Sequence, residues 1–389
     1  MLVCINITMK IFNFITFILV IIILFANISV SSFAQEALPN SKSFILIENS
    51  TGRVLSEYNS DERLPPASLT KIMLLLLIAE EVNAGRLSLD EQVTATAHAA
   101  SMTGSVIWLE PGEIMSVADL IKSVVISSAN DSAVALAEHI GGSEQGFVKL
   151  MNQKAYVLGM KDTNFVGVVG YDAPNHYTTA RDAAVMSRAL MREENYAIFS
   201  EHMLTRLCSV RTGTERETQL LNTNNLITYY NGIEGIKTGT TDNAGYCLSA
   251  AATRNDMRLI SVVMGCEDNY DRVDLSEKLL DSGFAGYQLH NPPKTQFDNI
   301  PATGGVKRDL AIEQLDPPAI VIPRGLSGEI EYEIYLPDEV TAPIVRNQPV
   351  GTITAMLDGE VVYESYIVAA ETVQKLTFWR IFKPSNFNP

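Results

Sequence analysis

Cysteine is scarce in this sequence, with four residues among 389. Cys208, Cys247 and Cys266 show no CxxC or Cys/His spacing, and Cys4 lies in an N-terminal segment that we expect to be removed. At most one intramolecular disulfide can then form, which excludes a fold held together by several disulfides. Cys247 and Cys266 fall in adjacent predicted strands, so a bridge and a pair of buried thiols are both open.

Histidine and basic residues are also in short supply. The five histidines lack metal-ligand spacing, so we expect core or surface roles for them and no metal or other cofactor; they are His98, His139, His176, His202 and His290. Lys and Arg number 29 against 45 Asp and Glu, a formal net charge of −16. Because a general nucleic-acid binder needs a basic face, this balance argues against nucleic acid as a partner.

One apolar run, residues 11–28, approaches the length of a membrane span. Lys10 precedes it, and the small residues Ser32 and Ala34 follow before Gln35. This order is typical of a secretory signal peptide, so we expect residues 1–34 to be cleaved and the protein to be exported. An uncleaved N-terminal anchor is the alternative.

Residues 35–290 are predicted to form one domain of mixed helix and sheet. The pattern favours an antiparallel sheet with the terminal strands at its centre and helices on both sides. The expected elements are two strands within 43–58 turning at 49–52, helices over 68–84, 116–126, 131–140 and about 180–192, a hairpin over 244–265 turning at 254–256, and a helix near 275–282. Thr179 and Asp182 are placed to cap the fourth helix.

The composition changes after residue 291. Asn291, Pro292 and Pro293 are typical of a linker, and residues 300–370 alternate or run apolar as strands do. Asp358-Gly359 is a strong hairpin turn. We therefore expect a small all-β domain over 291–370. The tail, 371–389, mixes aromatic and basic residues, which suits an anionic membrane surface, although docking on its own domain explains it equally well.

Ser68 and Lys71 stand at the entrance of the apolar stretch "IMLLLLIA". Residues three apart on a helix share one face, so the two side chains can meet. A serine hydroxyl becomes a good nucleophile when a neighbouring base takes its proton. Lysine can be that base once burial and a second positive charge lower its pKa. A capped helix start with a solvated lysine is the ordinary alternative.

Two further polar groups fit the same chemistry. Ser128-Ala129-Asn130 falls between two predicted helices, where a loop could present both side chains; helix capping by Asn130 or Asp131 is the alternative. Lys237-Thr238-Gly239 is expected to open an apolar strand, with Lys237 adding positive field and Gly239 allowing a ligand close to the backbone. A strand end with a solvated lysine is the alternative there.

In this order, SxxK, SxN and KTG form the motif set of penicillin-binding proteins and class A β-lactamases. The segments "ASLTKIM", "SSANDSAVALAE", "YTTARDAAVMSRAL" and "GIKTGTTDNAGYCLSAAA" resemble the low-molecular-mass penicillin-binding proteins that are D-alanyl-D-alanine carboxypeptidases, the S11-like peptidases. The resemblance covers nearly everything after residue 40. It implies an α+β fold, transpeptidase-like with a helical subdomain, followed by the all-β domain.

The resemblance also implies roles for the site residues. Ser68 attacks the carbonyl between two D-alanines and Lys71 takes its proton. Ser128 and Lys237 relay a proton to the leaving D-alanine, and Asn130 orients the substrate amide. The implied substrate-binding residues are Thr238, Gly239 and Thr240, with the backbone N–H groups of Ser68 and Thr240 forming the oxyanion hole. The implied partners are peptidoglycan stem peptides and β-lactams, in the periplasm or on the outer face of the cytoplasmic membrane.

Two positions depart from the family pattern. Thr240 stands where histidine is common, and Thr223 stands between two asparagines where some members carry arginine. Both changes affect substrate affinity more than reaction type.

Three rival functions share this scaffold. A class A β-lactamase positions its deacylating water with a glutamate in the segment between the second and third motifs, and residues 162–182 contain no glutamate. A D,D-endopeptidase acting on cross-links is the second rival, and product analysis separates it from a carboxypeptidase. A non-catalytic binding protein is the third, but it usually loses a motif residue, and none is missing here.

Overall fold

The structure is a computed structural model that describes residues 41–376, except 214–215, 293, 316–318 and 326–328. The predicted signal peptide and residues 377–389 of the predicted tail lie outside the described residues. Within the described ranges, no helix is both long enough and apolar enough to cross a membrane.

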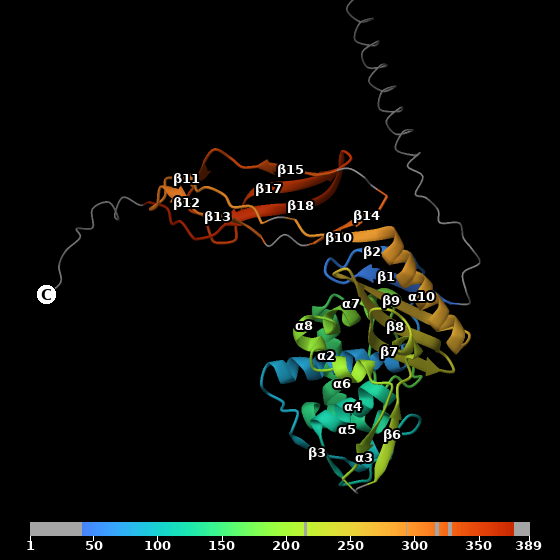
Figure 1. The fold of residues 1–389 in the computed structure, drawn as a ribbon. Helices are drawn as coiled ribbons and strands as arrows, with labels where there is room; N and C mark the ends of the chain where they lie inside the picture. Colours follow the sequence, from blue (N-terminus) through green and yellow to red (C-terminus); the bar gives the residue numbers. More distant parts are fainter. Residues whose placement is uncertain (1–40, 214–215, 293, 316–318, 326–328, 377–389) are drawn as a thin grey trace, which may run out of the picture. The chain divides into compact units, whose positions relative to one another are not determined.

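A five-stranded antiparallel sheet in the order β2-β1-β9-β8-β7 organises the first part of the chain (Figure 1). Its strands are β1 (Ser43–Glu48), β2 (Val54–Tyr58), β7 (Ile233–Thr241), β8 (Gly245–Arg254) and β9 (Met257–Cys266). Strand β1 pairs with β9, so the first and last strands lie side by side within the sheet, as predicted. The predicted hairpin turn is also confirmed, because Asn255 and Asp256 adopt the positive φ angles (49° and 62°) that a tight turn requires.

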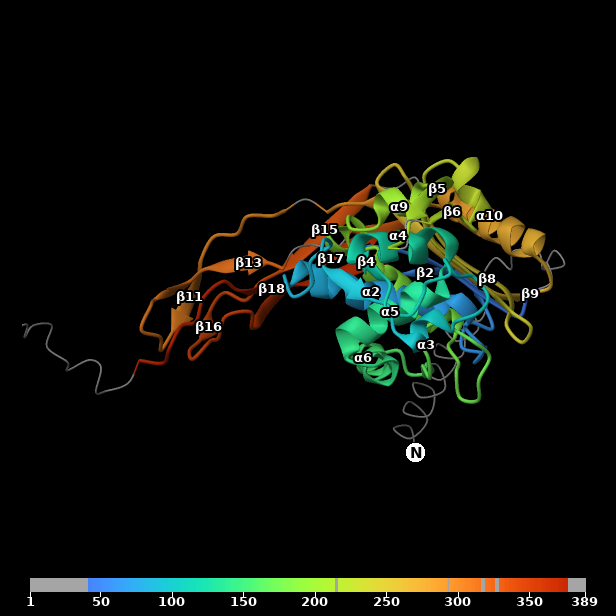
Figure 2. The same cartoon turned by 90° about the horizontal axis from the view of Figure 1, so that it is seen from below.

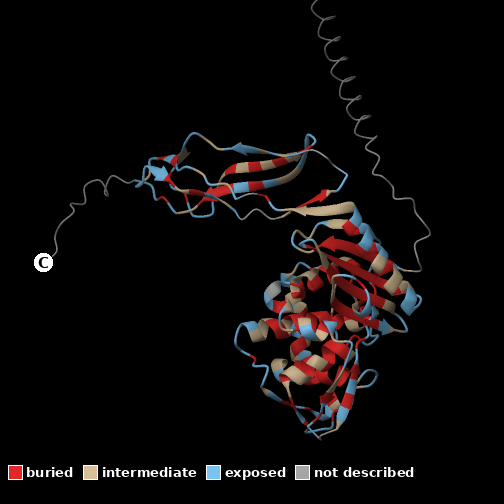
Figure 3. Cartoon of the chain, in the orientation of Figure 1, coloured by how far each residue is buried: buried red, intermediate tan, exposed pale blue. Residues whose placement is uncertain are grey.

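Successive side chains of a strand point to opposite faces of the sheet, so the sheet separates two hydrophobic cores. On one face Ile45 and Ile47 pack with α2 (Thr70–Asn83) and α7 (Ala180–Leu190). On the other face Phe44 and Leu46 pack with α10 (Asn269–Gly286). Figure 3 shows the resulting buried strands between their covering helices. The prediction of helices on both faces is confirmed, and α10 extends well beyond the predicted 275–282.

The remaining helices and short strands lie between β2 and β7 in the chain. They are β3 (Gln92–Thr94), α3 (Ala97–Ala100), β4 (Ile114–Ser116), α4 (Val117–Ser127), α5 (Asn130–Gly141), α6 (Glu144–Val157), α8 (Glu193–Tyr196), α9 (Ser200–Leu204), β5 (Leu207–Arg211), β6 (Glu217–Leu221) and the 3₁₀ turn η2 (Asn225–Thr228). Strands β3 and β4 pair antiparallel, as do β5 and β6. The Thr179 hydroxyl accepts the Asp182 N–H, so the predicted cap of α7 is confirmed.

Helix α2 passes through the middle of this part of the molecule. It contacts α5, α6, α7 and α8 as well as β7 (Figures 1 and 2). The residues Ile72 to Ala79 are buried apart from Leu77, which is partly buried, so the helix is surrounded by protein as its all-round apolar sequence predicts. Burial of each leucine or isoleucine side chain contributes about 1.5–3 kcal/mol to the stability of the fold. This packing holds the helix in place, and with it the N-terminus of α2.

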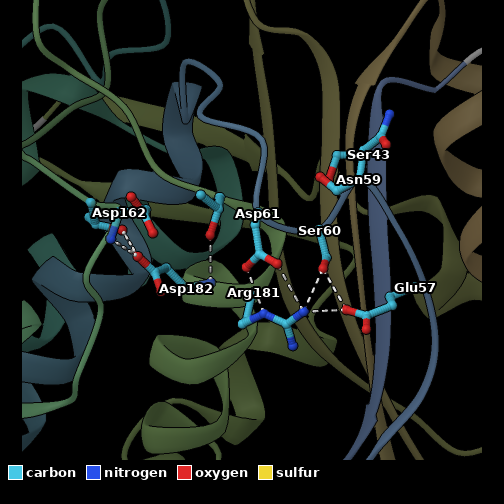
Figure 4. A network of polar contacts seen from close by, with 10 residues as sticks. Ser43, Glu57, Asn59, Ser60, Asp61, Asp162, Arg181 and Asp182 are labelled. Atoms are coloured by element: carbon cyan, nitrogen blue, oxygen red, sulfur yellow. Dashed lines mark hydrogen bonds and ion pairs between the residues drawn. The ribbon is translucent and has the colours of Figure 1, made fainter.

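Residues 158–179 connect α6 to α7 without a helix or named strand of their own. Figure 4 shows polar contacts that join Asp162, near the start of this segment, to α7, and α7 to residues 57–61. Arg181 Nε lies 2.7 Å from Asp61 Oδ1, and a second guanidinium nitrogen pairs with Glu57. The Asp182 carboxylate accepts the Asp162 N–H at 2.9 Å. The start of the segment is thereby joined to α7, and α7 to the chain that follows β2.

The C-terminal part is all-β, as predicted. Its strands are β11 (Ile300–Thr303), β12 (Asp309–Leu310), β13 (Ile312–Gln314), β14 (Ile320–Pro323), β15 (Ile330–Tyr335), β16 (Val340–Thr341), β17 (Pro349–Leu357) and β18 (Glu360–Ala369). They form sheets in the orders β12-β11-β16 and β13-β18-β17-β15, and β14 pairs with β10 (Tyr287–His290). Asp358 and Gly359 have positive φ and form the predicted β17–β18 turn.

Candidate active site

Ser68 lies in a short 3₁₀ turn, η1 (Ala67–Leu69), which leads into α2. The sequence predicts Ser68 as the first helical residue, whereas α2 itself begins at Thr70. Ala67 has a φ of 46°, an unfavourable left-handed conformation for a residue with a side chain. Its carbonyl packs so tightly on Gly170 that a Cβ there would lie 1.8 Å from the oxygen. Tertiary packing therefore holds the turn that carries Ser68.

Lys71 is fully buried on the first turn of α2. Its Nζ lies 3.0 Å from Ser68 Oγ, 2.6 Å from Asn130 Oδ1 and 3.2 Å from the Val169 carbonyl oxygen. Burial holds the pKa of Lys71 well below its usual value, and the positive charge of Lys237 lowers it further against the opposing charge of Asp131. The alternative of a solvated lysine is wrong.

The Ser128–Asn130 segment joins α4 to α5. Ser128 takes the left-handed conformation that ends α4, and its buried hydroxyl has no hydrogen-bond partner among the described residues. The Asn130 amide nitrogen donates to the Thr103 carbonyl at 2.7 Å, while its oxygen faces Lys71. The Asp131 carboxylate accepts the backbone N–H groups of Ile107 and Leu109. The Asn130 side chain therefore does not cap a helix, because its hydrogen bonds go to Thr103 and Lys71.

Lys237, Thr238 and Gly239 lie inside β7, so the prediction that they open a strand is wrong. β7 is the edge strand of the sheet, and Gly239 passes so close to η1 that a Cβ would lie 2.9 Å from the Ser68 nitrogen. Lys237 is buried rather than solvated, and its Nζ donates to the Thr238 carbonyl at 3.0 Å. Burial, with the Arg272 charge as a smaller cause, lowers the pKa of Lys237 to about 7.

Sequence reasoning missed Arg272. This arginine of α10 is buried, and its guanidinium donates to the Gly239 carbonyl at 3.0 Å and to Thr240 Oγ1 at 3.2 Å. It thus supports β7 at the third motif. A single arginine in a polar helix start has no pattern that would distinguish it in the sequence.

The two departures from the family pattern both have hydrogen-bond partners on β7. Thr223 Oγ1 lies 2.5 Å from Thr238 Oγ1, and the Thr240 hydroxyl donates to the Gly239 carbonyl at 2.8 Å. Thr223 therefore contacts the third motif through a hydroxyl rather than through a cation. Thr240 keeps its own side chain folded onto the strand.

The three cysteines of the described chain are thiols rather than members of a disulfide. Cys208, Cys247 and Cys266 are free, and burial raises the pKa of Cys247 to about 11 and that of Cys266 to about 12. His176 is buried against Thr70 Oγ1, and its pKa is lowered to about 4 by burial. Within the described ranges, no cluster of three or more His, Cys, Asp or Glu side chains is arranged to hold a metal ion.

Comparison with known proteins gives two family matches. Residues 31–268 match the family profile described as D-alanyl-D-alanine carboxypeptidase, peptidase S11. The chain belongs to the D-alanyl-D-alanine carboxypeptidase family. Residues 294–375 match the C-terminal domain of penicillin-binding protein 5, which agrees with the all-β part of this family member.

Relatives cover almost the whole chain. It is 40% identical over 356 residues to the D-alanyl-D-alanine carboxypeptidase DacF of Bacillus subtilis, covering 91% of this chain and 90% of the relative. It is 37% identical to DacC of Escherichia coli, covering 87% and 86%. The crystal structure of penicillin-binding protein 5 from Haemophilus influenzae superposes with a TM-score of 0.78 at 31% identity, covering 87% of this chain and 98% of that one. The predicted α+β fold with a C-terminal all-β domain is confirmed.

Proposed function

We propose that this serine-type D-alanyl-D-alanine carboxypeptidase removes the terminal D-alanine from peptidoglycan stem pentapeptides, with Ser68 as nucleophile and Lys71 as its base. Family membership and relatives named for this activity over most of their length support the reaction class. The observation that carries the residue assignment is the position of Lys71 Nζ, buried and 3.0 Å from Ser68 Oγ.

The neighbours of Lys71 support a transfer of the Ser68 proton to Lys71. A neutral amine has two N–H donors and one lone pair. The Asn130 Oδ1 and Val169 carbonyl oxygens can only accept hydrogen bonds, so they take the two N–H groups. The lone pair is left for the third neighbour, the Ser68 hydroxyl, which can donate. The lowered pKa of Lys71 supplies the neutral amine that this arrangement needs.

Acylation then forms a bond between Ser68 Oγ and the carbonyl carbon of the penultimate D-alanine. The developing oxyanion is placed between the Ser68 N–H and the N–H of Thr240, an assignment supported by the close approach of β7 to the Ser68 nitrogen. The C–N bond breaks as Ser128 and Lys237 pass a proton to the leaving amine. The unpartnered Ser128 hydroxyl is consistent with this relay. Water then hydrolyses the ester and restores Ser68.

Lys237, Thr238 and Thr240 are proposed to bind the terminal carboxylate, which gives exopeptidase specificity. Gly239 lets the substrate lie against the strand, and Asn130 orients the substrate amide. In a penicillin the same attack opens the β-lactam ring, and the leaving nitrogen stays tethered to the adduct. We therefore expect a long-lived penicilloyl-enzyme.

The decisive experiment combines a pentapeptide stem with the Ser68→Ala variant. The wild-type protein should release one alanine, detected by mass, and should be labelled by fluorescent penicillin. Ser68→Ala should do neither, because the other two hydrogen-bond partners of Lys71 Nζ are an amide oxygen and a backbone carbonyl. Labelling retained in Ser68→Ala would remove Ser68 as the nucleophile, and drug turnover at many per second would support a β-lactamase.

The place of action is also a proposal, and it rests on the sequence. We propose that residues 1–34 direct export, that the catalytic domain at 35–290 and the β domain at 291–370 act outside the cytoplasmic membrane, and that the tail at 371–389 forms a peripheral membrane contact. The apolar run after Lys10 and the aromatic-basic tail support this arrangement. A mature N-terminus at Gln35, found by N-terminal sequencing, would agree with cleavage; a start at Met1 would contradict it.

A further inference from the structure

The Val169 carbonyl is one of the three oxygens around Lys71, yet it belongs to the irregular segment 158–179 rather than to a helix or strand. A backbone carbonyl can orient the amine only if the residues before it in the chain are held still. The Val168 N–H, one residue earlier, donates to Glu144 Oε1 at 3.1 Å. Glu144 comes from α6, and its hydrogen bond and ion pair involve none of the three motifs.

The segment is partly held by packing, because the Val168 and Val169 side chains are buried in the hydrophobic core. A pocket of about 210 Å³ lies behind it, lined by His98, Met102, Glu144, Val169, Tyr171 and His176 among others. On the opposite side, Gly170 is pressed against the Ala67 carbonyl and Val169 faces Lys71. The Glu144 side chain, which lines this pocket, adds a directional contact to the Val168 N–H.

Glu144 is itself oriented by a neighbour. Its Oε2 lies 3.6 Å from His98 Nε2, and its side chain is 16% exposed. His98 Nδ1 lies 2.8 Å from Glu138 Oε1 on α5, so the imidazole stands between two carboxylates. The Glu138 carboxylate also accepts the Thr96 hydroxyl at 2.6 Å. Both carboxylates therefore touch His98, and Glu144 is the one that also holds the Val168 N–H.

We propose that Glu144 is a positioning residue for acylation. By holding the Val168 N–H, it fixes the Val169 carbonyl against Lys71, so that the amine lone pair points at the Ser68 hydroxyl. This inference rests on the proposed roles of Ser68 and Lys71. It extends the active site to a residue on α6, behind the segment that carries Val169.

The test compares Glu144→Leu with Glu144→Gln in the full chain. Leucine removes the acceptor, so kcat on the pentapeptide and the second-order rate of penicillin acylation should both fall about 10- to 100-fold, as small displacements of catalytic geometry do. KM should change less than about two-fold, because Glu144 touches no residue proposed to bind substrate. Glutamine keeps an oxygen acceptor for Val168, so its rates should stay within about three-fold of wild type.

A purely structural role predicts a different pattern. Glu144 lies in the first turn of α6, where its negative charge interacts favourably with the helix dipole. Glutamine and leucine both remove that charge, so a dipole role would affect both variants alike in thermal melting and leave their rates alone. The positioning role is supported if the rates fall only in Glu144→Leu, which lacks the acceptor, while Tm changes alike in both variants, which lack the charge.

Glu138→Leu is the matched control, because it removes a carboxylate from His98 and leaves the Glu144–Val168 bond in place. Its rates should stay within about two-fold of wild type. The proposal is overturned if Glu144→Leu folds and acylates at the wild-type rate, or if Glu138→Leu falls as far as Glu144→Leu. Failure of the proposed function would instead appear as labelling in Ser68→Ala, a separate result.

Discussion

The helix side and the strand side of the active site each bury a lysine, but they use it differently. Lys71 on α2 is surrounded by oxygens from three separate segments, among them the Ser68 hydroxyl. Lys237 on edge strand β7 donates to the carbonyl of its own neighbour, Thr238. Both pKa values are lowered mainly by burial. Burial alone therefore does not decide what a lysine does; the atoms within reach of its nitrogen do.

The second cause of each pKa shift sharpens this contrast. Lys71 is pushed towards the neutral form by the charge of Lys237, whereas Lys237 is pushed by Arg272 behind the strand. The charge of Arg272 on α10 therefore lowers the pKa of Lys237 on β7, and the charge of Lys237 in turn lowers the pKa of Lys71 on α2. We propose that the lowered pKa of Lys71 favours its neutral form for proton abstraction, and that Lys237, whose pKa is lowered to about 7, binds a carboxylate as a cation.

The largest expected effect comes from Lys71→Met, which removes the base and keeps a side chain of similar length. The rate of D-alanine release should fall about 10²- to 10⁴-fold, the usual contribution of general base catalysis. The variant should also gain folding stability relative to the wild type as pH falls. The unfolded chain binds a proton on Lys71 below pH ~10.4 that the folded chain does not, so wild-type stability decreases on going from alkaline to neutral pH. The Tm difference, variant minus wild type, should grow more positive over that range.

Lys149→Met provides the control for Lys71→Met. Lys149 is exposed on α6, so its loss should change neither the rate of D-alanine release nor the pH dependence of Tm. Melting curves and release assays at matched pH values check both variants. Substantial activity in Lys71→Met, or a Tm difference that shrinks as pH falls, would contradict the assignment of Lys71 as a buried neutral base.

A smaller effect is expected from Lys237→Arg, which tests the strand side alone. In the wild type, Lys237 loses its charge above about pH 7, so kcat/KM for a substrate with a terminal carboxylate should decline on the alkaline side. Arginine stays charged throughout, so its profile should lack that decline, although the bulkier head and the loss of proton transfer through Lys237 should lower the maximum. An unchanged alkaline limb in Lys237→Arg would show that another group titrates there.

In the candidate active site, the sequence predicts which side chains meet better than it predicts which backbone groups contact them. SxxK, SxN and KTG each carry a residue-type pattern, and their order predicted that Ser68, Lys71 and Asn130 meet. Strand alternation and the polar 254–256 turn predicted the central sheet. The Val169 carbonyl has no such signal, because any residue supplies a carbonyl and its direction depends on the path of residues 158–179. Arg272 and Glu144 were missed for a related reason, since each acts through backbone groups distant in sequence.

The smallest effect is expected from Thr223→Val, which removes one hydroxyl from the strand side and keeps the shape. Thr223 lies between the buried Asn222 and Asn224, and the Asn222 side chain accepts the Asn224 N–H and donates to the Met203 carbonyl. This turn holds Thr223 Oγ1 at 2.5 Å from Thr238 Oγ1. A neutral hydrogen bond contributes about 0.5–1.5 kcal/mol, so KM for the pentapeptide should rise about 2- to 10-fold while kcat is unchanged.

Thr228→Val is the matched control for Thr223→Val, because it removes a hydroxyl bond to the Asn225 carbonyl at an exposed position of η2. Its KM should equal that of the wild type, and Thr223→Ser, which restores the hydroxyl, should recover the wild-type KM. A fall in kcat with KM unchanged in Thr223→Val would place Thr223 with the proton-transfer groups of the helix side. A rise in KM alone would leave it with Thr238, which we propose to bind the terminal carboxylate.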